Sequence, residues 1–306
     1  MQEQNEPFNF SELASHEQQA NETPPLESFH ARDGVALAFR RYTAESNVHL
    51  ILIHGSSAHS AYLHTFAEYL GNKHIANVYT PDLRGHGPNP QRRGDIDYIG
   101  QLEEDIADLI THIKTQTDDS DNSVFIIGGH SSGGGMALRF SGSQYGNLAS
   151  GLLLLAPFFG HNAPMVKKNS GGWASPKISR IIGLSILNGF GIKQFNGAKV
   201  LRFNLPAKYQ NGEETLEYSF RLMTGMHPDD YKQSLANSHG PLLLLVGTQD
   251  EAFYFDKFES GVVPFKSDAQ IAHIEGSSHL GITLHEAAMQ TAAGWIKANF
   301  THSTRL

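Results

Sequence analysis

The chain of 306 residues has no cysteine, so disulfide bonds, cysteine-based zinc sites and thiol catalysis are all excluded. It has no run of 18 or more apolar residues, so no segment is predicted to span a membrane. Basic tracts are missing too: 23 Lys and Arg against 31 Asp and Glu give a net charge of −8, which argues against a nucleic-acid partner. The 17 histidines are scattered without metal-binding spacing, so no metal site is predicted.

The pattern of apolar residues predicts one α/β core with an insertion. Residues 1–25 are polar and lack the basic-then-apolar order of a secretory signal, so we expect a flexible N-terminal arm or a surface-packed extension, and a cytoplasmic protein. Strand-like and helical patterns alternate over 26–157 and again over 241–306, which predicts a doubly wound, mostly parallel sheet. The stretch 158–240 shows no comparable strand and is predicted to form a mainly helical cap.

The individual elements are predicted from period and turn residues. An Asp33-Gly34 turn predicts a hairpin over residues 27–42. The pattern predicts strands at 48–53, 75–81, 124–127, 151–156, 242–246 and 268–274, and the near-continuous apolar run of the first predicts burial on both faces. Helical spacing predicts helices at 61–70, 99–113, 136–140 and 286–300, with helical pieces of the cap at 178–187 and 214–223.

A Gly-rich turn after the 124–127 strand is the most informative stretch of the chain. It reads Gly129-x-Ser131-x-Gly133, the spacing of a nucleophile elbow, in which a sharp strand-to-helix turn exposes a serine hydroxyl. Glycine is needed on both sides because a β-carbon there would collide with the turn. The stretch lacks the Gly-Lys-Ser/Thr ending of a P-loop, so a phosphate-binding turn is disfavoured and Ser131 is the candidate nucleophile.

An acid and a base follow in the order that a nucleophile elbow requires. Asp250 comes just after the 242–246 strand, and His279 lies in a Gly/Ser loop after the 268–274 strand. Carboxyl ends of neighbouring parallel strands meet at one edge of the sheet, so we expect both side chains near Ser131. His279 is then the general base and Asp250 the residue that orients it.

Other acids and histidines nearby leave alternatives open. Asp256 or Glu251 could replace Asp250, and His273 or His285 could replace His279. Ser131 itself could be an ordinary turn serine. For the oxyanion of an acyl-transfer reaction we expect the backbone N–H groups of Ser132, after the nucleophile, and of Ser56, after the 48–53 strand. Asp82 at a strand end is expected to accept a hydrogen bond rather than to act in catalysis.

Five motifs together resemble those of the α/β-hydrolases, in particular the lysophospholipase and monoacylglycerol lipase branch. They are His54-Gly55, Asp82-x-Arg84-Gly85-His86-Gly87, Gly129-His130-Ser131-x-Gly133-Gly134, Gly247-x-x-Asp250 and His279. The resemblance covers roughly residues 27–157 and 241–300, and it implies the α/β-hydrolase fold with a sheet of about eight strands. It also implies that His54 and His86 are hydrogen-bonded loop residues.

The resemblance implies a serine hydrolase that needs no cofactor or metal and cleaves carboxylic esters, with lipid-like monoacyl esters first among them. A serine at the elbow disfavours epoxide hydrolases and haloalkane dehalogenases, which carry aspartate there. The alternatives are an esterase, thioesterase or peptidase for a small soluble substrate, and a ligand-binding relative without catalysis.

The substrate side of the site is predicted only from apolar composition. Phe158 and Phe159 follow the 151–156 strand and are candidate walls of an acyl pocket, or simply core. Leu184 and Leu187 belong to a cap stretch, 178–192, with very few charges. That stretch either packs over the sheet, lines an acyl-chain pocket, or makes transient contact with a membrane surface.

Overall fold

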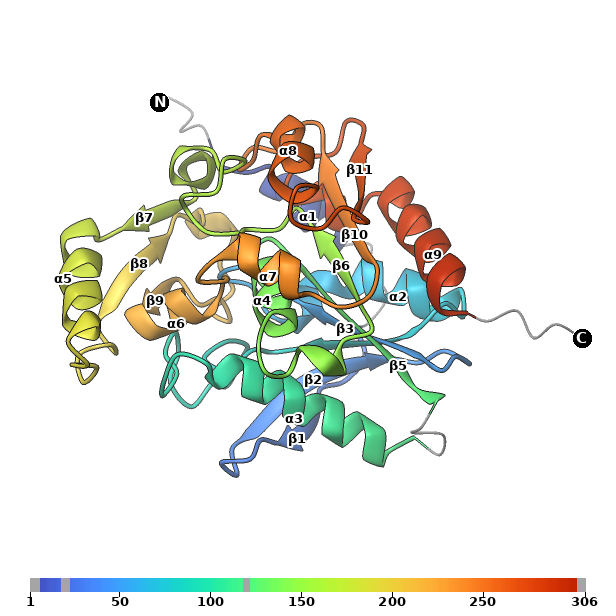
Figure 1. Ribbon diagram of the computed structural model, residues 1–306, viewed down its shortest axis with the longest axis horizontal. Coiled ribbons are helices and arrows are strands. Elements are labelled where there is room, and N and C mark those ends of the chain that lie inside the picture. The colour runs from blue at the N-terminus through green and yellow to red at the C-terminus, as the bar shows by residue number, and fades with distance from the viewer. Residues whose placement is uncertain (1–5, 18–22, 118–121, 302–306) are drawn as a thin grey trace, which may run out of the picture.

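A computed structural model describes residues 6–17, 23–117 and 122–301, and all structural statements concern these residues. One sheet forms the centre of the molecule. Its strands are β1 (Glu27–His30), β2 (Ala36–Tyr42), β3 (Val48–Ile53), β4 (Asn77–Pro81), β5 (Val124–His130), β6 (Gly151–Leu155), β10 (Leu242–Gly247) and β11 (Gln270–Ile274). They lie in the order β1-β2-β4-β3-β5-β6-β10-β11 (Figure 1).

The sheet is mostly parallel, as predicted. β2 is antiparallel to both β1 and β4, and the remaining neighbours in this sheet are parallel. The central strands are buried on both faces: every residue of β3, β6 and β10 is buried. This double burial is why each of them is a continuous apolar run rather than an alternating one.

Helices cover the sheet in two layers. They are α2 (His64–Asn72), α3 (Gln101–Thr115), α4 (Ser132–Ser141), α8 (Phe258–Val262) and α9 (Glu286–Phe300). α2 contacts α9 on one face, while α3 contacts α4 on the other (Figure 1). The predicted amphipathic helix is confirmed in α3, whose buried residues include Leu102, Ile106, Leu109 and Ile113. In the described part of the chain, no helix has the length and apolar character needed to cross a membrane.

Between β6 and β10 the chain forms α5 (Ile178–Gly189), α6 (Phe220–Gly225), α7 (Tyr231–Asn237) and a small antiparallel sheet that was not predicted. The strands of this sheet, in the order β7-β8-β9, are β7 (Ala174–Pro176), β8 (Lys199–Phe203) and β9 (Glu217–Ser219). Two of them have only three residues, too few to show a period of two in the sequence. The helix predicted at 214–223 is therefore wrong in its first half, where β9 lies.

Charged side chains attach this inserted segment to the loop after β4. Arg221 donates from Nε and Nη2 to both carboxylate oxygens of Asp95, at 2.8 and 2.6 Å. Lys199 donates from Nζ to the backbone carbonyls of Arg93 and Gly94, each at 2.8 Å. Both contacts are partly buried, so they hold the insertion against the core more firmly than exposed ion pairs do.

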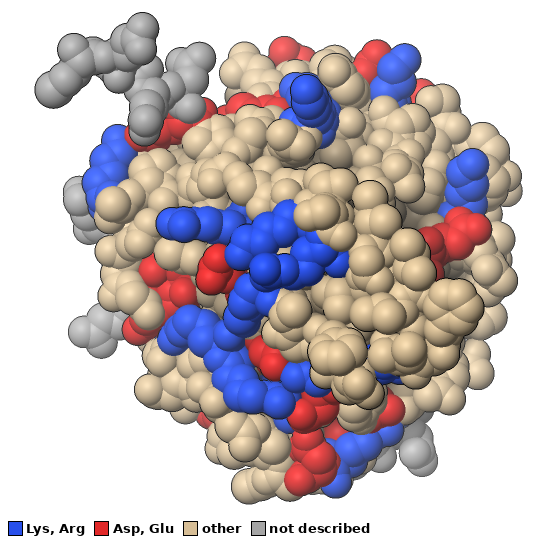
Figure 2. Space-filling view, turned by 90° about the vertical axis from the view of Figure 1, so that its left-hand side faces the viewer, with Lys and Arg blue, Asp and Glu red and all other residues tan. Residues whose placement is uncertain are grey.

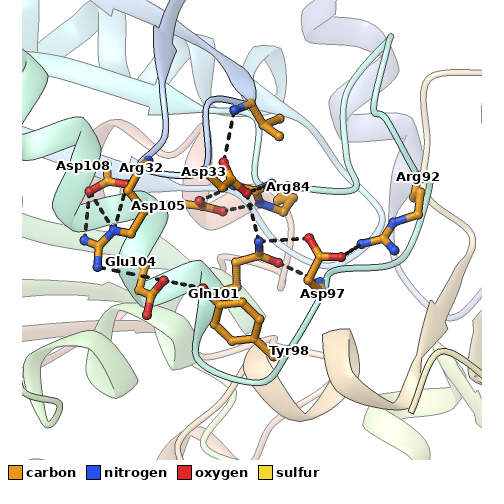
Figure 3. Close-up of polar contacts among 11 residues, drawn as sticks. Arg32, Asp33, Arg84, Arg92, Asp97, Tyr98, Gln101, Glu104, Asp105 and Asp108 are labelled. Atoms are coloured by element: carbon orange, nitrogen blue, oxygen red, sulfur yellow. Dashed lines mark hydrogen bonds and ion pairs between the residues drawn. The ribbon is translucent and has the colours of Figure 1, made fainter. Parts of the chain in front are cut away.

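A buried arginine joins the hairpin, the same loop and α3 (Figure 3). Arg84 donates to both oxygens of Asp105 in α3, at 2.9 and 2.7 Å, and its Nη1 lies 2.9 Å from Oδ2 of Asp33. Asp33 in turn accepts from the backbone N–H of Val35 at the turn between β1 and β2. The planar guanidinium thus pairs with two carboxylates at once and fixes the start of the Gly85-His86-Gly87 loop.

Candidate active site

The turn after β5 has the strained backbone that a nucleophile elbow requires. Ser131 has φ 55° and ψ −119°, in the positive-φ half of the Ramachandran plot, which residues with a β-carbon rarely adopt. A β-carbon on Gly129 would lie 2.4 Å from the carbonyl of Gly133, and one on Gly133 would lie 2.3 Å from the carbonyl oxygen of Ile53. Both predicted glycines are therefore required by the turn. Ser131 stands between the last residue of β5 and the first of α4.

The structure brings the three predicted side chains together. The hydroxyl of Ser131 lies 3.1 Å from Nε2 of His279, and Nδ1 of His279 lies 2.8 Å from Oδ2 of Asp250. With the ring proton on Nδ1, His279 donates to Asp250 and accepts from Ser131. Asp250 and His279 are 3% and 1% exposed, so this line of hydrogen bonds is shielded from water. Shielding strengthens each interaction along it.

The second carboxylate oxygen of Asp250 is held by backbone. Oδ1 accepts from the N–H groups of Ala252 and Phe253, both at 2.8 Å. These two donors fix the carboxylate in the plane that directs Oδ2 at His279. They also replace the hydrogen bonds to water that the carboxylate loses when it is buried.

The alternatives lie elsewhere or act differently. Glu251 accepts from the backbone N–H of His279 at 2.8 Å, so it supports the loop and does not face the ring nitrogens. His273 lies in β11 against Phe255, and His285 caps α9 by accepting from Ala287 N–H. Asp256 lies in a short 3-10 helix that ends at Lys257.

A second buried histidine supports the loop of His279, a role that was not predicted from the sequence. His130 donates from Nε2 to the carbonyl oxygen of His279 at 2.9 Å, and its Nδ1 accepts from the hydroxyl of Tyr62 at 3.1 Å. Burial, with His279 as a smaller cause, holds the pKa of His130 well below its usual range. A neutral ring that donates at one nitrogen and accepts at the other fits this arrangement. The only signal in the sequence was its position next to the elbow serine.

The two amides predicted to bind the oxyanion are free. Neither Ser56 N–H nor Ser132 N–H forms a hydrogen bond within the described part of the chain. Ser132 is the first residue of α4, where helical N–H groups have no partner inside the helix. The indole of Trp173 donates to the hydroxyl of Ser56 at 2.8 Å and so holds this loop from the cap side.

His54, His86 and Asp82 are hydrogen-bonded loop residues, as predicted. His54 donates from Nδ1 to Gly55 and accepts at Nε2 from the backbone N–H of Leu83, and burial lowers its pKa to about 4. Asp82 accepts from the backbone N–H of Ser60 at 2.6 Å.

His86 and Tyr218 connect the inserted segment to the loop that carries Ser56. His86 accepts at Nε2 from the hydroxyl of Tyr218 in β9, at 2.5 Å, and burial keeps its pKa well below the usual range. The Tyr218 hydroxyl itself accepts from the backbone N–H of Ser57 at 3.1 Å. The loop that carries Ser56 is thus held on both sides.

A cavity of about 290 Å³ opens beside Ser131 and His279. Its apolar wall consists of Phe8, Phe10, Leu13, Trp173, Leu205 and Leu280. Polar groups, among them Lys208 and Glu214, line another part of it. No group of three or more metal-ligating side chains occurs in the residues that the structure describes.

The structure does not place the four predicted substrate contacts in this cavity. Leu184 is buried in a separate cluster with Val200 and Phe220, and Leu187 packs against that cluster. Phe159 stacks on Tyr231 and meets Phe258, while Phe158 contacts His227. All four predictions rested on apolar composition near the site. Phe158 and Phe159 pack in or against the main core and Leu184 and Leu187 in or against the separate cluster, so none of the four lines this cavity.

The cavity instead receives residues from the predicted flexible arm. Over residues 6–17 this arm is packed: Phe8 and Phe10 are buried and α1 (Phe10–Glu17) follows. Of the two alternatives expected for residues 1–25, a flexible arm or a packed extension, this segment shows packing, because its aromatic rings dock on Trp173 and His279. Residues 1–5 and 18–22 lie outside the described residues. One feature of the sequence could have predicted this packing: Phe8 and Phe10 are aromatic residues in an otherwise polar stretch.

A family described as serine aminopeptidase, S33 (Hydrolase_4) matches residues 44–283. The chain belongs to this family of serine hydrolases with the α/β-hydrolase fold. A relative, the monoacylglycerol lipase of Mycolicibacterium smegmatis, is 28% identical to this chain over 132 residues. That match spans 42% of this chain and 45% of the relative, so the chain matches less than half of the relative's length.

Two solved structures show the same fold as this S33 family member. A soluble variant of monoglyceride lipase from Saccharomyces cerevisiae has a TM-score of 0.65 at 16% identity, over 92% of this chain and 97% of that one. A monoacylglycerol lipase from Paleococcus ferrophilus has a TM-score of 0.64 at 17% identity, over 86% and 98%. At such identities the likeness concerns the fold.

Proposed function

We propose that this S33 family member cleaves carboxylic esters through an acyl-serine intermediate, with Ser131, His279 and Asp250 as a catalytic triad. The observation that carries the proposal is the line of two hydrogen bonds from the Ser131 hydroxyl through His279 to Asp250, at the wall of a cavity. A binding module has no need for a strained serine aligned with a buried histidine and carboxylate.

In the first half-reaction the Ser131 oxygen attacks the ester carbonyl while its proton moves to Nε2 of His279. Asp250 keeps the ring oriented and stabilises the imidazolium that forms. The N–H groups of Ser56 and Ser132 donate to the new oxyanion. Collapse of the tetrahedral intermediate breaks the bond to the alcohol, which takes the proton from His279 and leaves an acyl-Ser131 ester.

In the second half-reaction water replaces the alcohol. His279 takes a proton from the water as its oxygen attacks the acyl carbonyl, and the same two amides donate to the second oxyanion. Collapse then releases the carboxylic acid, and the proton returns from His279 to the Ser131 oxygen. All groups are restored without a cofactor.

The substrate class that we propose is a lipid-like monoacyl ester. The aromatic and aliphatic wall of the cavity suits an acyl chain, and its polar part suits a hydroxylated leaving group. The monoacylglycerol lipase relative and the two lipase structures agree with this class.

We also propose residues 26–157 and 241–306 as the catalytic core and 158–240 as its cap. A cytoplasmic location stays a prediction.

A series of p-nitrophenyl esters from acetate to palmitate tests the substrate class. We expect kcat/KM to rise toward medium or long chains, because each added methylene is removed from water in the apolar cavity. A fluorophosphonate probe should label the protein at Ser131. Turnover confined to the shortest esters would indicate a small-substrate esterase instead. Labelling without ester turnover would direct the search to thioesters and peptides.

The exposed face of α5 supports the further proposal of transient contact with a membrane. Ile178, Ile182, Ile186 and Phe190 recur every four residues and are 55–79% exposed. Residues 158–212 contain six Lys, two Arg and no Asp or Glu, in a protein of net charge −8. Figure 2 shows Lys and Arg gathered on this side of the molecule. Apolar residues beside basic ones suit an anionic lipid surface.

Replacing Ile182 and Ile186 together with asparagine should weaken binding to phosphatidylglycerol vesicles about tenfold or more, because two exposed apolar side chains no longer enter the lipid. Vesicle co-sedimentation measures this directly. The matched control is Ser185→Asn on the same helix, which should bind as the wild type does. Equal binding of the double variant and the wild type would refute the membrane contact.

A further inference from the structure

A segment far from the catalytic residues in sequence supplies part of the cavity wall. We call residues 6–17 the N-terminal segment. In Figure 1 its helix α1 lies near β10, and hydrogen bonds join the segment to Glu251 and Ser278 in the loops that carry Asp250 and His279. Phe8, Phe10 and Leu13 of this segment all face the cavity that contains Ser131.

The aromatic rings of the N-terminal segment form one cluster with the catalytic loop and the cap. The ring centre of Phe8 lies 4.7 Å from that of His279 and 5.3 Å from that of Trp173. Phe10 lies 5.6 Å from Trp173 and 5.4 Å from Tyr209. Phe8 and Phe10 are only 4% and 5% exposed. An acyl chain attached to Ser131 therefore has these rings, rather than Leu184 or Leu187, as its apolar neighbours.

Polar contacts fix the N-terminal segment to the loop of the base. Asn9 donates its backbone N–H to Oε1 of Glu251, whose Oε2 accepts from the backbone N–H of His279. Glu12 accepts from the hydroxyl of Ser278 at 2.5 Å. At its other end the segment pairs with the cap, because Oε1 of Glu6 lies 2.6 Å from Nζ of Lys208. These contacts determine where both phenylalanine rings lie relative to Ser131.

We propose that Phe8 and Phe10 of the N-terminal segment are specificity-determining residues that contact the acyl chain of the substrate. This inference rests on the proposed ester hydrolysis for its substrate class. Phe8 lies against the ring of His279, which contacts Ser131. Phe10 lines the cavity farther along the aromatic cluster. Short acyl groups end before Phe10, whereas medium chains pack against it, so Phe10 discriminates between acyl lengths.

The test compares p-nitrophenyl decanoate with p-nitrophenyl acetate in the full chain. In Phe10→Ala the ratio of kcat/KM for decanoate over acetate should fall about tenfold, because the chain loses its contact with the ring and the wall opens to water. The conservative variant Phe10→Leu keeps an apolar wall and should restore most of the ratio. The matched control is Phe195→Ala, which removes an exposed phenylalanine of the cap and should leave the ratio as it is.

An unchanged ratio in a folded Phe10→Ala protein would overturn the proposal, as would an equal fall in Phe195→Ala. Thermal melting shows whether each variant is folded. Should Phe10→Ala unfold, Phe10→Trp serves as the test: its larger ring narrows the path of a medium acyl chain but not that of acetate, so it should also lower the ratio. If Phe10→Leu also lost the ratio while its melting temperature stayed close to that of the wild type, ring shape rather than apolar contact would be the determinant, and the proposal as stated would fail.

Binding without turnover separates this inference from the proposed function. Decanoate titrated into the Ser131→Ala protein should change the emission of Trp173, which lies against both phenylalanines, with Trp295→Phe removing the background of the chain's other tryptophan. Phe10→Ala should weaken this binding about tenfold. Decanoate binding that depends on Phe10, together with a wild type that turns over no ester, would refute ester hydrolysis and uphold the site. Ester turnover by the wild type, with decanoate binding that does not change in Phe10→Ala, would uphold ester hydrolysis and refute the Phe10 contact.

Discussion

Replacing Ser131 with alanine should lower kcat on p-nitrophenyl esters by about five to six orders of magnitude. Without the hydroxyl no acyl-enzyme forms, and only the oxyanion donors and substrate binding remain to assist water. Alanine at φ 55° meets the same backbone strain as serine, so the melting temperature should stay close to that of the wild type. Stopped-flow and overnight assays together span the range of rates.

Ser141→Ala is the matched control for this variant. It removes the hydroxyl of the last residue of α4, which is buried and has no hydrogen-bond partner in the described structure, and it should keep wild-type activity. If Ser131→Ala retained more than about one per cent of the activity, a mechanism without acyl-Ser131 would be required.

Replacing Asp250 with asparagine should lower kcat about ten-thousandfold with little change in KM. The physical reason lies in the two backbone N–H groups of Ala252 and Phe253, which bind one oxygen of Asp250. They will keep the amide oxygen of asparagine in that position and turn its NH₂ group toward His279. His279 must then accept at Nδ1, so its proton moves to Nε2, and the nitrogen that faces Ser131 can no longer act as a base.

Asp256→Asn provides the control and decides between the two acids. It should keep activity within about threefold of the wild type, since a surface substitution away from the triad seldom matters. A large loss in Asp256→Asn with an active Asp250→Asn would reverse the assignment. Equal and small effects in both would mean that His279 needs no orienting acid.

The sheet and the three central site residues were predictable because each has a local signature. Buried parallel strands are continuous apolar runs, and the elbow serine needs glycines at fixed spacing. Asp250 and His279 could be placed because the carboxyl ends of parallel strands meet at one edge. The support of Asp250 by backbone N–H groups, in contrast, depends on the exact path of the loop, which no spacing rule describes.

The substrate side could not be predicted because its contacts are not local. Phe8 is buried by Trp173 and His279, which are 165 and 271 residues away in the chain (173 − 8 and 279 − 8). The apolar composition of α5 was visible, but composition does not say which face is covered. Leu184 is buried within the inserted segment, whereas Ile182 and Ile186 are exposed. The three-residue strands of the inserted segment had no period to detect.

The pairing of β6 with β10 has a consequence for synthesis and folding. Leu152–Leu155 bind Leu242–Leu245 in register, although the whole inserted segment separates them in the chain. Closing so long a loop is slow compared with forming the local pairs among β1 to β6. Until Leu242 leaves the ribosome, β6 presents an edge of consecutive leucines without a partner. A chain interrupted in this interval would carry a strongly aggregation-prone strand, and a chaperone that shields such edges would be needed most at this stage.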